Sequence, residues 1–277
     1  MMNFITKRFF FSTLITLLIS HFTLAQDLYV LHVSGDILNT TNNVNLKVGD
    51  MISKDASLSF GSNNAKAIVI GKSTGKMLLD GSKSKKSPTG EFMSLVSEVL
   101  FPIQSNKQMS TRSVLFESVA NISDYFNGDA YVFITDSIIL DINQEKYPLN
   151  EEKQMALRFT SGEEIFNRWI PNYGDNKLLL EKERLFEGAS LDEIETVDVY
   201  YVVKASRKID HIGSFNPIFV NQDQLKEELI SLKSFLSTNQ TEKAEEIQAE
   251  LYQYVLDIYG QTDFEMFNEW IKDEGII

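Results

Sequence analysis

Paired acidic side chains are the groups in this sequence with the clearest chemical potential. Two carboxylates can act as general acid and base, or as acid and nucleophile, in the hydrolysis of a glycosidic bond. Acidic residues also stabilise the first turn of a helix, where backbone N–H groups have no partner within the helix. Three acidic pairs fall where we predict a helix to start, so capping explains them without catalysis: Glu163-Glu164, Asp192-Glu193, and Asp263 with Glu265.

Histidine and metal-ligand patterns are sparse. Only His32 and His211 lie beyond the first 25 residues. Serine hydrolases need a positioned histidine as the base, whereas His32 lies inside a predicted strand as a core or edge residue. Neither histidine has a second one at a metal-binding spacing, and no acidic run matches a calcium loop. The sequence therefore predicts no catalytic residue, no metal site and no cofactor.

The stretch Gly71-Lys72-Ser73 matches the end of a phosphate-binding loop. The complete motif has a glycine five positions before Gly71, where this chain has Lys66. It also continues into a helix whose N–H groups bind the phosphates. Here Thr74-Gly75 and a predicted strand follow, so the pattern indicates a hairpin turn.

One basic cluster occurs in the Ser- and Lys-rich segment 81–90, which we predict to be a loop. Lys83, Lys85 and Lys86 form this cluster on a chain that is otherwise strongly acidic. They are candidates for contact with an anionic polymer or an acidic partner. A solvated loop is the alternative interpretation, and the one we expect.

Charge and cysteine content exclude several classes of function. The chain of 277 residues has a net charge of −13, and removing the two basic residues of the first 25 leaves −15. Such a surface repels nucleic acid and anionic lipid, so we expect no nucleic-acid partner. The absence of cysteine excludes disulfides, thiol catalysis, cysteine metal sites and a lipoprotein anchor.

The first 25 residues have the layout of a secretory signal peptide. Lys7 and Arg8 precede the apolar segment 9–24, and a small residue precedes the predicted cleavage between Ala25 and Gln26. An uncleaved membrane anchor is the alternative, but the apolar segment is short for a span of about 20 residues. We expect a bacterial protein that is periplasmic or secreted, with no membrane insertion after cleavage.

Residues 26–110 predict a small β-barrel or β-sandwich-like domain. Short apolar runs alternate with Gly, Asn, Asp and Ser, the pattern of tightly turned antiparallel strands. Residues 91–100 have apolar side chains at helical spacing and predict a short amphipathic helix. The polar segment 101–112 predicts a linker.

Within this domain, turn and strand motifs follow one another at Val33-Ser34-Gly35-Asp36, Leu46-Lys47-Val48-Gly49-Asp50, Ala56-Ser57-Leu58, 64–69 and 75–79. With these motifs, residues 31–80 resemble the FecR-type periplasmic β-module. A bacterial SH3-like barrel is the rival, because most of the shared motifs are turns. The resemblance implies a sensor or binding part in the periplasm. Full-length members of the iron-sensing type add a membrane span and an anti-sigma segment, which we do not find here, so a sigma-regulating role is not implied.

Residues 111–277 predict a second domain, which is β-rich and then helical. Segments 130–135, 137–142 and 196–204 have strand patterns. Segment 161–170 is ambiguous: Ser161 followed by Glu164 resembles a capping box and favours a helix, whereas a strand pair around Gly162 is the alternative.

The last part of the chain, residues 222–272, predicts an αα-hairpin and a short helix that close the second sheet. We expect caps at Asn221 (with Gln224), at Thr241, and at Thr262 (with Glu265). A further cap-like pair, Ser190 with Glu193, predicts one helical turn. The fold class is therefore α+β.

Together these patterns favour an exported, non-enzymatic protein of the cell envelope whose β-module binds a protein, peptide or glycan partner. One alternative is a secreted enzyme that acts on a glycan through carboxylates. Another is a purely structural envelope component. Two convergent carboxylates in a pocket would favour the enzyme, and an open groove would favour the binding protein.

Overall fold

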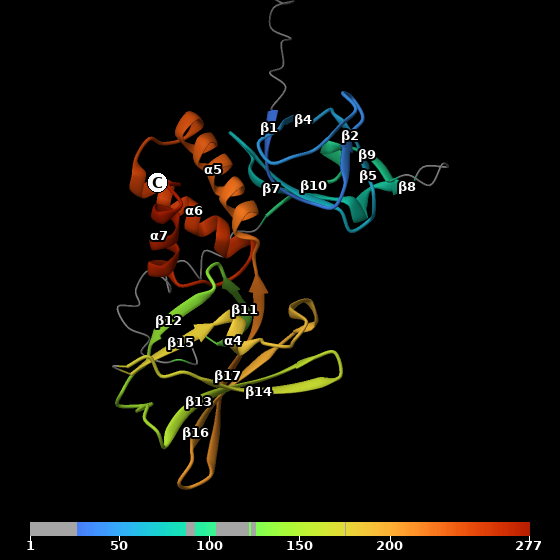
Figure 1. The fold of residues 1–277 in the computed structure, drawn as a ribbon. Coiled ribbons are helices and arrows are strands. Elements are labelled where there is room, and N and C mark those ends of the chain that lie inside the picture. Colours follow the sequence, from blue (N-terminus) through green and yellow to red (C-terminus); the bar gives the residue numbers. More distant parts are fainter. Residues whose placement is uncertain (1–26, 87–91, 104–121, 123–125, 175) are drawn as a thin grey trace, which may run out of the picture. The chain divides into compact units, whose positions relative to one another are not determined.

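The computed structural model describes residues 27–86, 92–103, 122, 126–174 and 176–277 (Figure 1). The chain is α+β, as predicted, and its contacts divide it into two compact units, with the boundary along the chain between Pro102 and Ile103. The predicted signal peptide, with its cleavage between Ala25 and Gln26, lies outside the described residues. Most of the predicted linker 101–112 lies outside them too.

The first unit is built from two antiparallel sheets of five strands each. Their orders are β10-β7-β6-β1-β4 and β3-β2-β5-β9-β8. Leu28 and Val69 in one sheet and Leu58 and Phe60 in the other belong to the same buried cluster, so the two sheets share a core in a sandwich-like arrangement. The strands are β1 (Asp27–Ser34), β2 (Ile37–Asn39), β3 (Val44–Asn45), β4 (Met51–Ser53), β5 (Ser57–Phe60), β6 (Lys66–Gly71), β7 (Gly75–Asp80), β8 (Lys85–Lys86), β9 (Phe92–Leu95) and β10 (Leu100–Pro102).

The helix predicted for residues 91–100 is wrong. The described part of this segment is β9, a single 3₁₀ turn at Val96–Glu98, and β10. Strand β9 pairs with β5, where Leu58 lies opposite Ser94, and β10 pairs with β7. Ser94 is buried while Leu95 is 42% exposed, the reverse of the helical pattern. Pairing with two existing strands satisfies the backbone hydrogen bonds and overrides the weak helical period.

The second unit has a five-stranded sheet in the order β11-β17-β16-β13-β14 and a separate pair, β12-β15. Strand β11 is parallel to β17, and the other neighbours are antiparallel. One face of the large sheet is packed with buried side chains, among them Leu157 and Val199. The elements are β11 (Asn127–Phe133), β12 (Ser137–Asp141), β13 (Lys153–Ser161), β14 (Glu164–Ile170), β15 (Lys177–Glu181), α4 (Lys182–Leu185), a 3₁₀ turn (Leu191–Glu193), β16 (Val197–Val203) and β17 (Lys208–Phe219).

Segment 161–170 is part of a strand pair, so the favoured helix is wrong and the alternative is confirmed. Ser161 pairs with Glu164 across a tight turn in which Gly162 has a φ of 59°. This left-handed conformation is accessible to glycine at little cost. Glu163 and Glu164 consequently lie in a hairpin, where helix capping no longer explains them. Asp192 and Glu193 do lie in a first helical turn, although Ser190 makes no side-chain cap.

Three helices end the chain, as predicted: α5 (Gln222–Asn239), α6 (Ala244–Ile258) and α7 (Phe264–Asp273). The cap at Asn221 is confirmed, because its Oδ1 accepts a hydrogen bond from the Gln224 backbone N at 3.0 Å. The cap at Thr241 is wrong, since α6 begins after Lys243 without a side-chain cap. The third helix is capped by Asp263, whose Oδ1 accepts from the Met266 N at 2.8 Å.

Thr262 is not the cap because its hydroxyl serves the junction between the helices and the sheet. Its Oγ1 donates to the Val132 carbonyl at 3.3 Å. Next to it, the Gln261 backbone N donates to the Ala130 carbonyl at 2.8 Å, and the Gln261 carbonyl accepts from the Val132 N at 2.7 Å. This backbone pairing extends the sheet beyond β11. In Figure 1 the three helices, coloured orange to red, lie together beside the end of β11.

Candidate functional site: a groove on the second sheet

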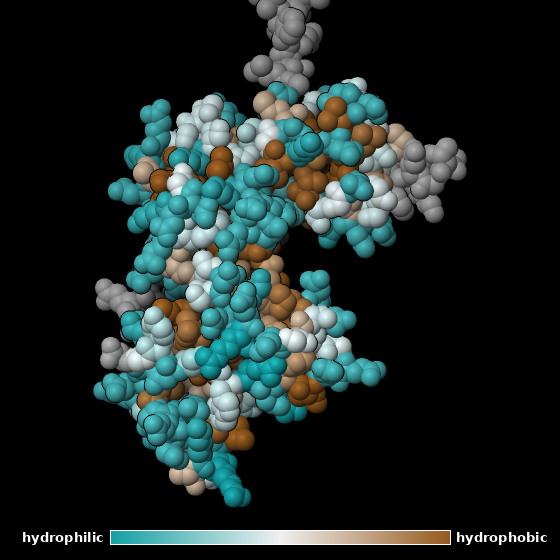
Figure 2. Space-filling model, viewed as in Figure 1, coloured by the Kyte–Doolittle hydropathy of each residue, from teal (hydrophilic) through white to brown (hydrophobic). Residues whose placement is uncertain are grey.

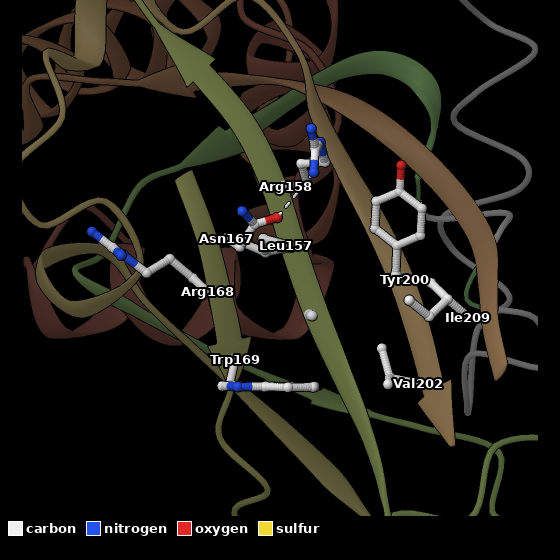
Figure 3. Close-up of a pocket in the computed structure, with 9 residues that line it drawn as sticks. Leu157, Arg158, Asn167, Arg168, Trp169, Tyr200, Val202 and Ile209 are labelled. Carbon is white, nitrogen blue, oxygen red and sulfur yellow. Dashed lines mark hydrogen bonds between the residues drawn. The ribbon is translucent and has the colours of Figure 1, made fainter. Parts of the chain in front are cut away.

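A half-open groove of about 540 Å³ lies on the outer face of the second sheet, over β14, β13, β16 and β17 (Figure 3). This volume is within the range of ligand pockets, about 300–1,000 Å³. Nine residues line it, among them Ala156, Arg158, Asn167, Trp169, Tyr200 and Ile209.

Strand alternation places these side chains on the outer face. Leu157 on β13 and Val199 on β16 point into the core, so their neighbours Ala156 and Tyr200 point outward. Register then brings the row together, because Ala156 lies opposite Trp169 on one side and opposite Tyr200 on the other. Each strand is about 4.8 Å from the next, which separates the backbones of the two aromatic residues by about 10 Å. The small Ala156 between two large rings forms the floor of the groove.

One end of the groove is polar. Two residues further along β13 from Ala156, Arg158 lies opposite Asn167 on β14 and Asp198 on β16. Arg158 Nη1 donates to Asn167 Oδ1 at 3.4 Å, a long hydrogen bond (Figure 3). Arg168 contributes to the lining, but its guanidinium points away and donates to the Glu187 carbonyl at 2.8 Å.

The other end is apolar and strongly exposed. Ile209 is 64% exposed and Trp169 is 50% exposed, and Val202 lies opposite Ile209 in the sheet. The Lys204 Nζ lies 5.4 Å from the centre of the Trp169 ring, a cation–π contact that holds one cation at the rim. Figure 2 shows hydrophobic side chains at the surface among the strands of this unit.

Asp198 and His211 form a further polar pair on this face. His211 Nε2 lies 3.1 Å from Asp198 Oδ1, and the His211 ring meets the edge of the Tyr200 ring at 5.2 Å between centres. The pair therefore orients Tyr200 at the wall of the groove. Both members are partly exposed, so the pair resembles a surface salt bridge rather than a buried catalytic dyad.

The groove lining consists of apolar, aromatic, amide and guanidinium groups, which are groups for recognition. It has none of the carboxylates that glycoside hydrolysis needs. Within the described ranges, no group of three or more His, Asp or Glu side chains is placed to hold a metal ion.

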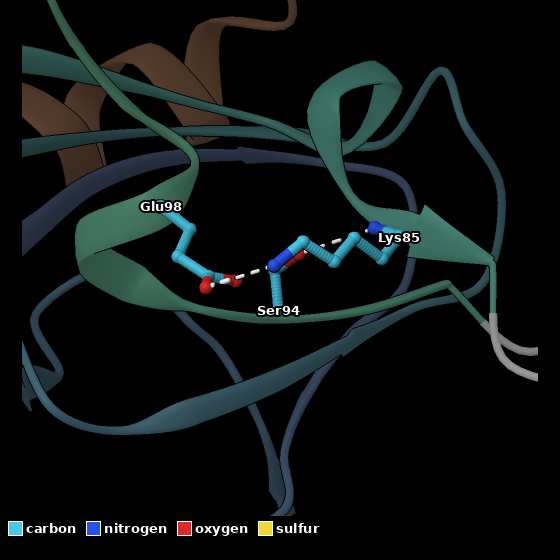
Figure 4. A network of polar contacts seen from close by, with 3 residues as sticks. All are labelled: Lys85, Ser94 and Glu98. Carbon is cyan, nitrogen blue, oxygen red and sulfur yellow. Dashed lines mark hydrogen bonds and ion pairs between the residues drawn. The ribbon is translucent and has the colours of Figure 1, made fainter.

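The predicted basic cluster is in the first unit. Lys85 Nζ donates to Glu98 Oε1 at 3.1 Å, and the Lys85 backbone N donates to Ser94 Oγ at 3.2 Å (Figure 4). Lys83 is exposed in a short 3₁₀ turn, and the Lys86 side chain lies outside the described residues. One of the three cations is thus already engaged by a carboxylate.

We predict a small effect on stability when Lys85 is replaced by alanine. The side chains of Lys85 and Glu98 are 79% and 40% exposed, and exposed ion pairs contribute about 0–1 kcal/mol because solvent and salt screen them. Urea unfolding followed by far-UV circular dichroism measures the change in free energy. A loss above about 2 kcal/mol would show that the pair stabilises the first unit far more than its exposure implies.

The remaining motif residues are structural. Gly71 pairs with Gly75 at the end of the β6–β7 hairpin, so the predicted hairpin turn is confirmed. The five residues 71–75 also have the G-x-S-x-G spacing of a hydrolase nucleophile turn. That turn joins a strand to a helix, whereas this one joins two strands. His32 lies within β1, opposite Ile68.

The first unit has a hollow of about 100 Å³ beside Asn39 and Asp50, which is small for a ligand site. The larger groove uses residues that the sequence analysis did not single out. A signal was present in segment 196–204, where Tyr200 and Val202 are apolar on the face opposite the buried one. When a strand is apolar on both faces and only one face is packed in the core, the other face exposes apolar side chains that a partner can cover.

Comparison of the chain with protein-family models and with curated proteins found no match. Within the described residues, none of the helices combines the length and the apolar character needed to span a membrane. The geometry of the groove is therefore the main basis for a functional proposal.

Proposed function

We propose that this protein is an exported, non-enzymatic binding protein of the cell envelope, and that it holds a partner in the groove of the second unit. The observation that carries the proposal is the row Trp169–Ala156–Tyr200. It exposes two aromatic rings on either side of a small residue, next to Arg158 and Asn167. Exposed apolar surface rimmed by polar groups is a common feature of interaction sites.

The groove also discriminates between the functional classes. A carboxylate-dependent glycan enzyme would need two acidic groups about 5–10 Å apart in the same hollow. The lining has instead the Arg158 guanidinium, hydrogen-bonded to Asn167, and an apolar end at Ile209. These groups can hold a ligand by burial, stacking and hydrogen bonding, so the groove supports binding. The FecR-like character of the first unit remains part of the proposal and is consistent with a periplasmic location.

Site-specific photo-crosslinking tests the proposal, and the sequence allows a crosslinker to be attached at a single chosen position. The chain has no cysteine, so a single introduced cysteine is the only site for a maleimide label. We would place a benzophenone label at Asn167→Cys in the groove and at Ile139→Cys as the matched control. Ile139 is 48% exposed on β12, outside the groove. The labelled proteins would be irradiated with the native envelope fraction.

The expected result is a discrete adduct from the label at position 167 and none from position 139. Adding Trp169→Ala should lower the adduct yield about tenfold or more, because truncating a central aromatic anchor costs 2 kcal/mol or more at typical interfaces. Equal adducts from both positions, or an adduct that is indifferent to Trp169→Ala, would contradict binding in the groove.

A further inference from the structure

We infer that the occupant of the groove is an acidic polypeptide segment that inserts one large apolar side chain between Trp169 and Tyr200 and places a neighbouring carboxylate on Arg158. This inference rests on the proposed function and names the class of its partner. Three properties of the groove carry it: the composition of its walls, the charge around it, and the aliphatic character of its open end.

The walls have the composition of an interface centre between proteins. Trp, Tyr and Arg are the residue types most enriched among those that dominate binding energy, and they cluster in desolvated hollows. Here Trp169, Tyr200 and Arg158 surround a floor made by Ala156. A gap of about 10 Å between the two aromatic backbones can admit a ring or a branched aliphatic side chain between their walls.

The charge around the groove is opposite to the charge of the whole protein. The chain is −13, yet the outer face of the sheet holds Arg158 in the lining and Lys204 against Trp169. Asp198, the acidic residue opposite Arg158 in the sheet, is already engaged by His211. Among the described residues, no carboxylate lies within ion-pair distance of Arg158. A planar guanidinium in this position fits a carboxylate by two parallel hydrogen bonds.

The open end favours a polypeptide over a sugar chain. Ile209 is 64% exposed, and Val202, which also lines the groove, lies opposite it in the sheet. Neither aliphatic side chain offers a hydrogen bond to a hydroxyl-rich ligand, and covering them yields about 25 cal/mol for each Å² of apolar surface removed from water. A peptide with apolar side chains buries these groups, whereas the hydroxyl groups of a glycan would lose water against them without a new partner.

Selection from a phage-displayed library of random nine-residue peptides tests the inference. The library would be panned on the full chain from Gln26 onward, and separately on three variants: Arg158→Glu, Trp169→Ala and, as the matched control, Arg184→Glu. Arg184 is exposed on α4, outside the groove. Fluorescence-detected urea unfolding would first establish that each variant is folded. Labelled trigalacturonate, an acidic trisaccharide, would be titrated against the same proteins.

We expect enriched peptides that combine one Trp, Phe, Leu or Ile with an adjacent Asp or Glu. Arg158→Glu should shift the enriched residues from acidic to basic, because it reverses the charge that the peptide meets. Trp169→Ala should weaken the best peptides about 30-fold, the equivalent of an anchor residue at a protein interface. Arg184→Glu should leave both the enriched sequences and their affinity unchanged.

Two results would overturn the inference, and they are distinguishable from failure of the proposed function. Enriched peptides that lack acidic residues, or whose enrichment does not change with Arg158→Glu, would rule out an acidic polypeptide as the occupant of the groove. Binding of trigalacturonate that depends on Trp169, without any enriched peptide, would assign the groove to a glycan and leave the proposed function intact. Crosslinking that does not depend on the groove would instead remove the proposed function itself.

Discussion

Replacement of Glu228 by alanine is expected to lower the free energy of unfolding of the second unit by about 3 kcal/mol. Glu228 lies on α5 and is fully buried, with 0% of its surface exposed. Its Oε1 accepts a hydrogen bond from Gln224 Nε2 at 3.0 Å, and its Oε2 accepts from the Tyr254 hydroxyl at 2.9 Å and the Tyr259 hydroxyl at 2.7 Å. These bonds join α5 to the end of α6.

The size of the effect follows from what alanine would leave behind. Two tyrosine hydroxyls would lose a charged acceptor in a buried site, and each unsatisfied buried group costs about 1–3 kcal/mol. Burial raises the pKa of Tyr254 and of Tyr259, and the nearby Glu228 charge raises them further, so both hydroxyls stay protonated and need an acceptor. The variant would also lose the packing of the Glu228 side chain in the helix interface.

Urea unfolding measured by tryptophan fluorescence tests this prediction. Both tryptophans of the chain, Trp169 and Trp270, belong to the second unit and report its unfolding. Glu227→Ala is the matched control, since Glu227 is the exposed neighbour on the same helix and should change the free energy by less than about 0.5 kcal/mol. Tyr254→Phe should cost about 1.5–3 kcal/mol, the contribution of a hydrogen bond to a charged group. An alanine variant as stable as its control would refute a stabilising role for the network.

Replacement of Gly260 by alanine should destabilise the same unit by about 2–6 kcal/mol, because it adds backbone strain to a steric clash. Gly260 has a φ of 124°, and a Cβ atom there would lie 2.6 Å from the Ala130 carbonyl oxygen. The backbone cannot shift without breaking the hydrogen bond from the Gln261 N to that oxygen. This residue therefore sets how closely the end of α6 approaches β11.

Gly275→Ala separates strain from the clash. Gly275 also has a positive φ, 66°, but a Cβ atom there would meet nothing within 4 Å. This control should cost only about 1–2 kcal/mol, the strain of the left-handed conformation. Hydrogen exchange gives a second readout: the Val132 amide, which donates to the Gln261 carbonyl, should lose protection in Gly260→Ala and keep it in Gly275→Ala. Equal effects of the two variants would show that the approach to β11 is not tight.

The C-terminal helices could be predicted from sequence because their signals are local. The periodic apolar residues of α5 and the Asn221 cap act within a few residues of one another, and the structure confirms both. The caps predicted at Thr241 and Thr262 are both wrong, and for Thr262 the reason lies in the tertiary structure. The Thr262 hydroxyl donates to the Val132 carbonyl, which leaves the adjacent Asp263 to cap α7. Residue type narrows a cap to a few positions, and a distant strand can decide among them.

The strand segments show where local signals fail. Segments 91–100 and 161–170 carry helical spacing or a capping pattern, yet both form strands in the described residues. Segment 91–100 pairs with β5 and β7, and segment 161–170 folds back on β13 through Gly162. A short amphipathic segment has little intrinsic preference, so the partner that satisfies its backbone hydrogen bonds decides its conformation.

The sequence by itself determined the α+β class, the hairpin at residues 71–75 and the three terminal helices, because turn chemistry and helical period act over neighbouring residues. Only the tertiary structure decided the groove. Trp169, Ala156 and Tyr200 lie on three different strands, and they form one row because the register aligns them across β14, β13 and β16. A shift of one residue in any of these strands would turn its side chain to the other face, and no local pattern specifies that register.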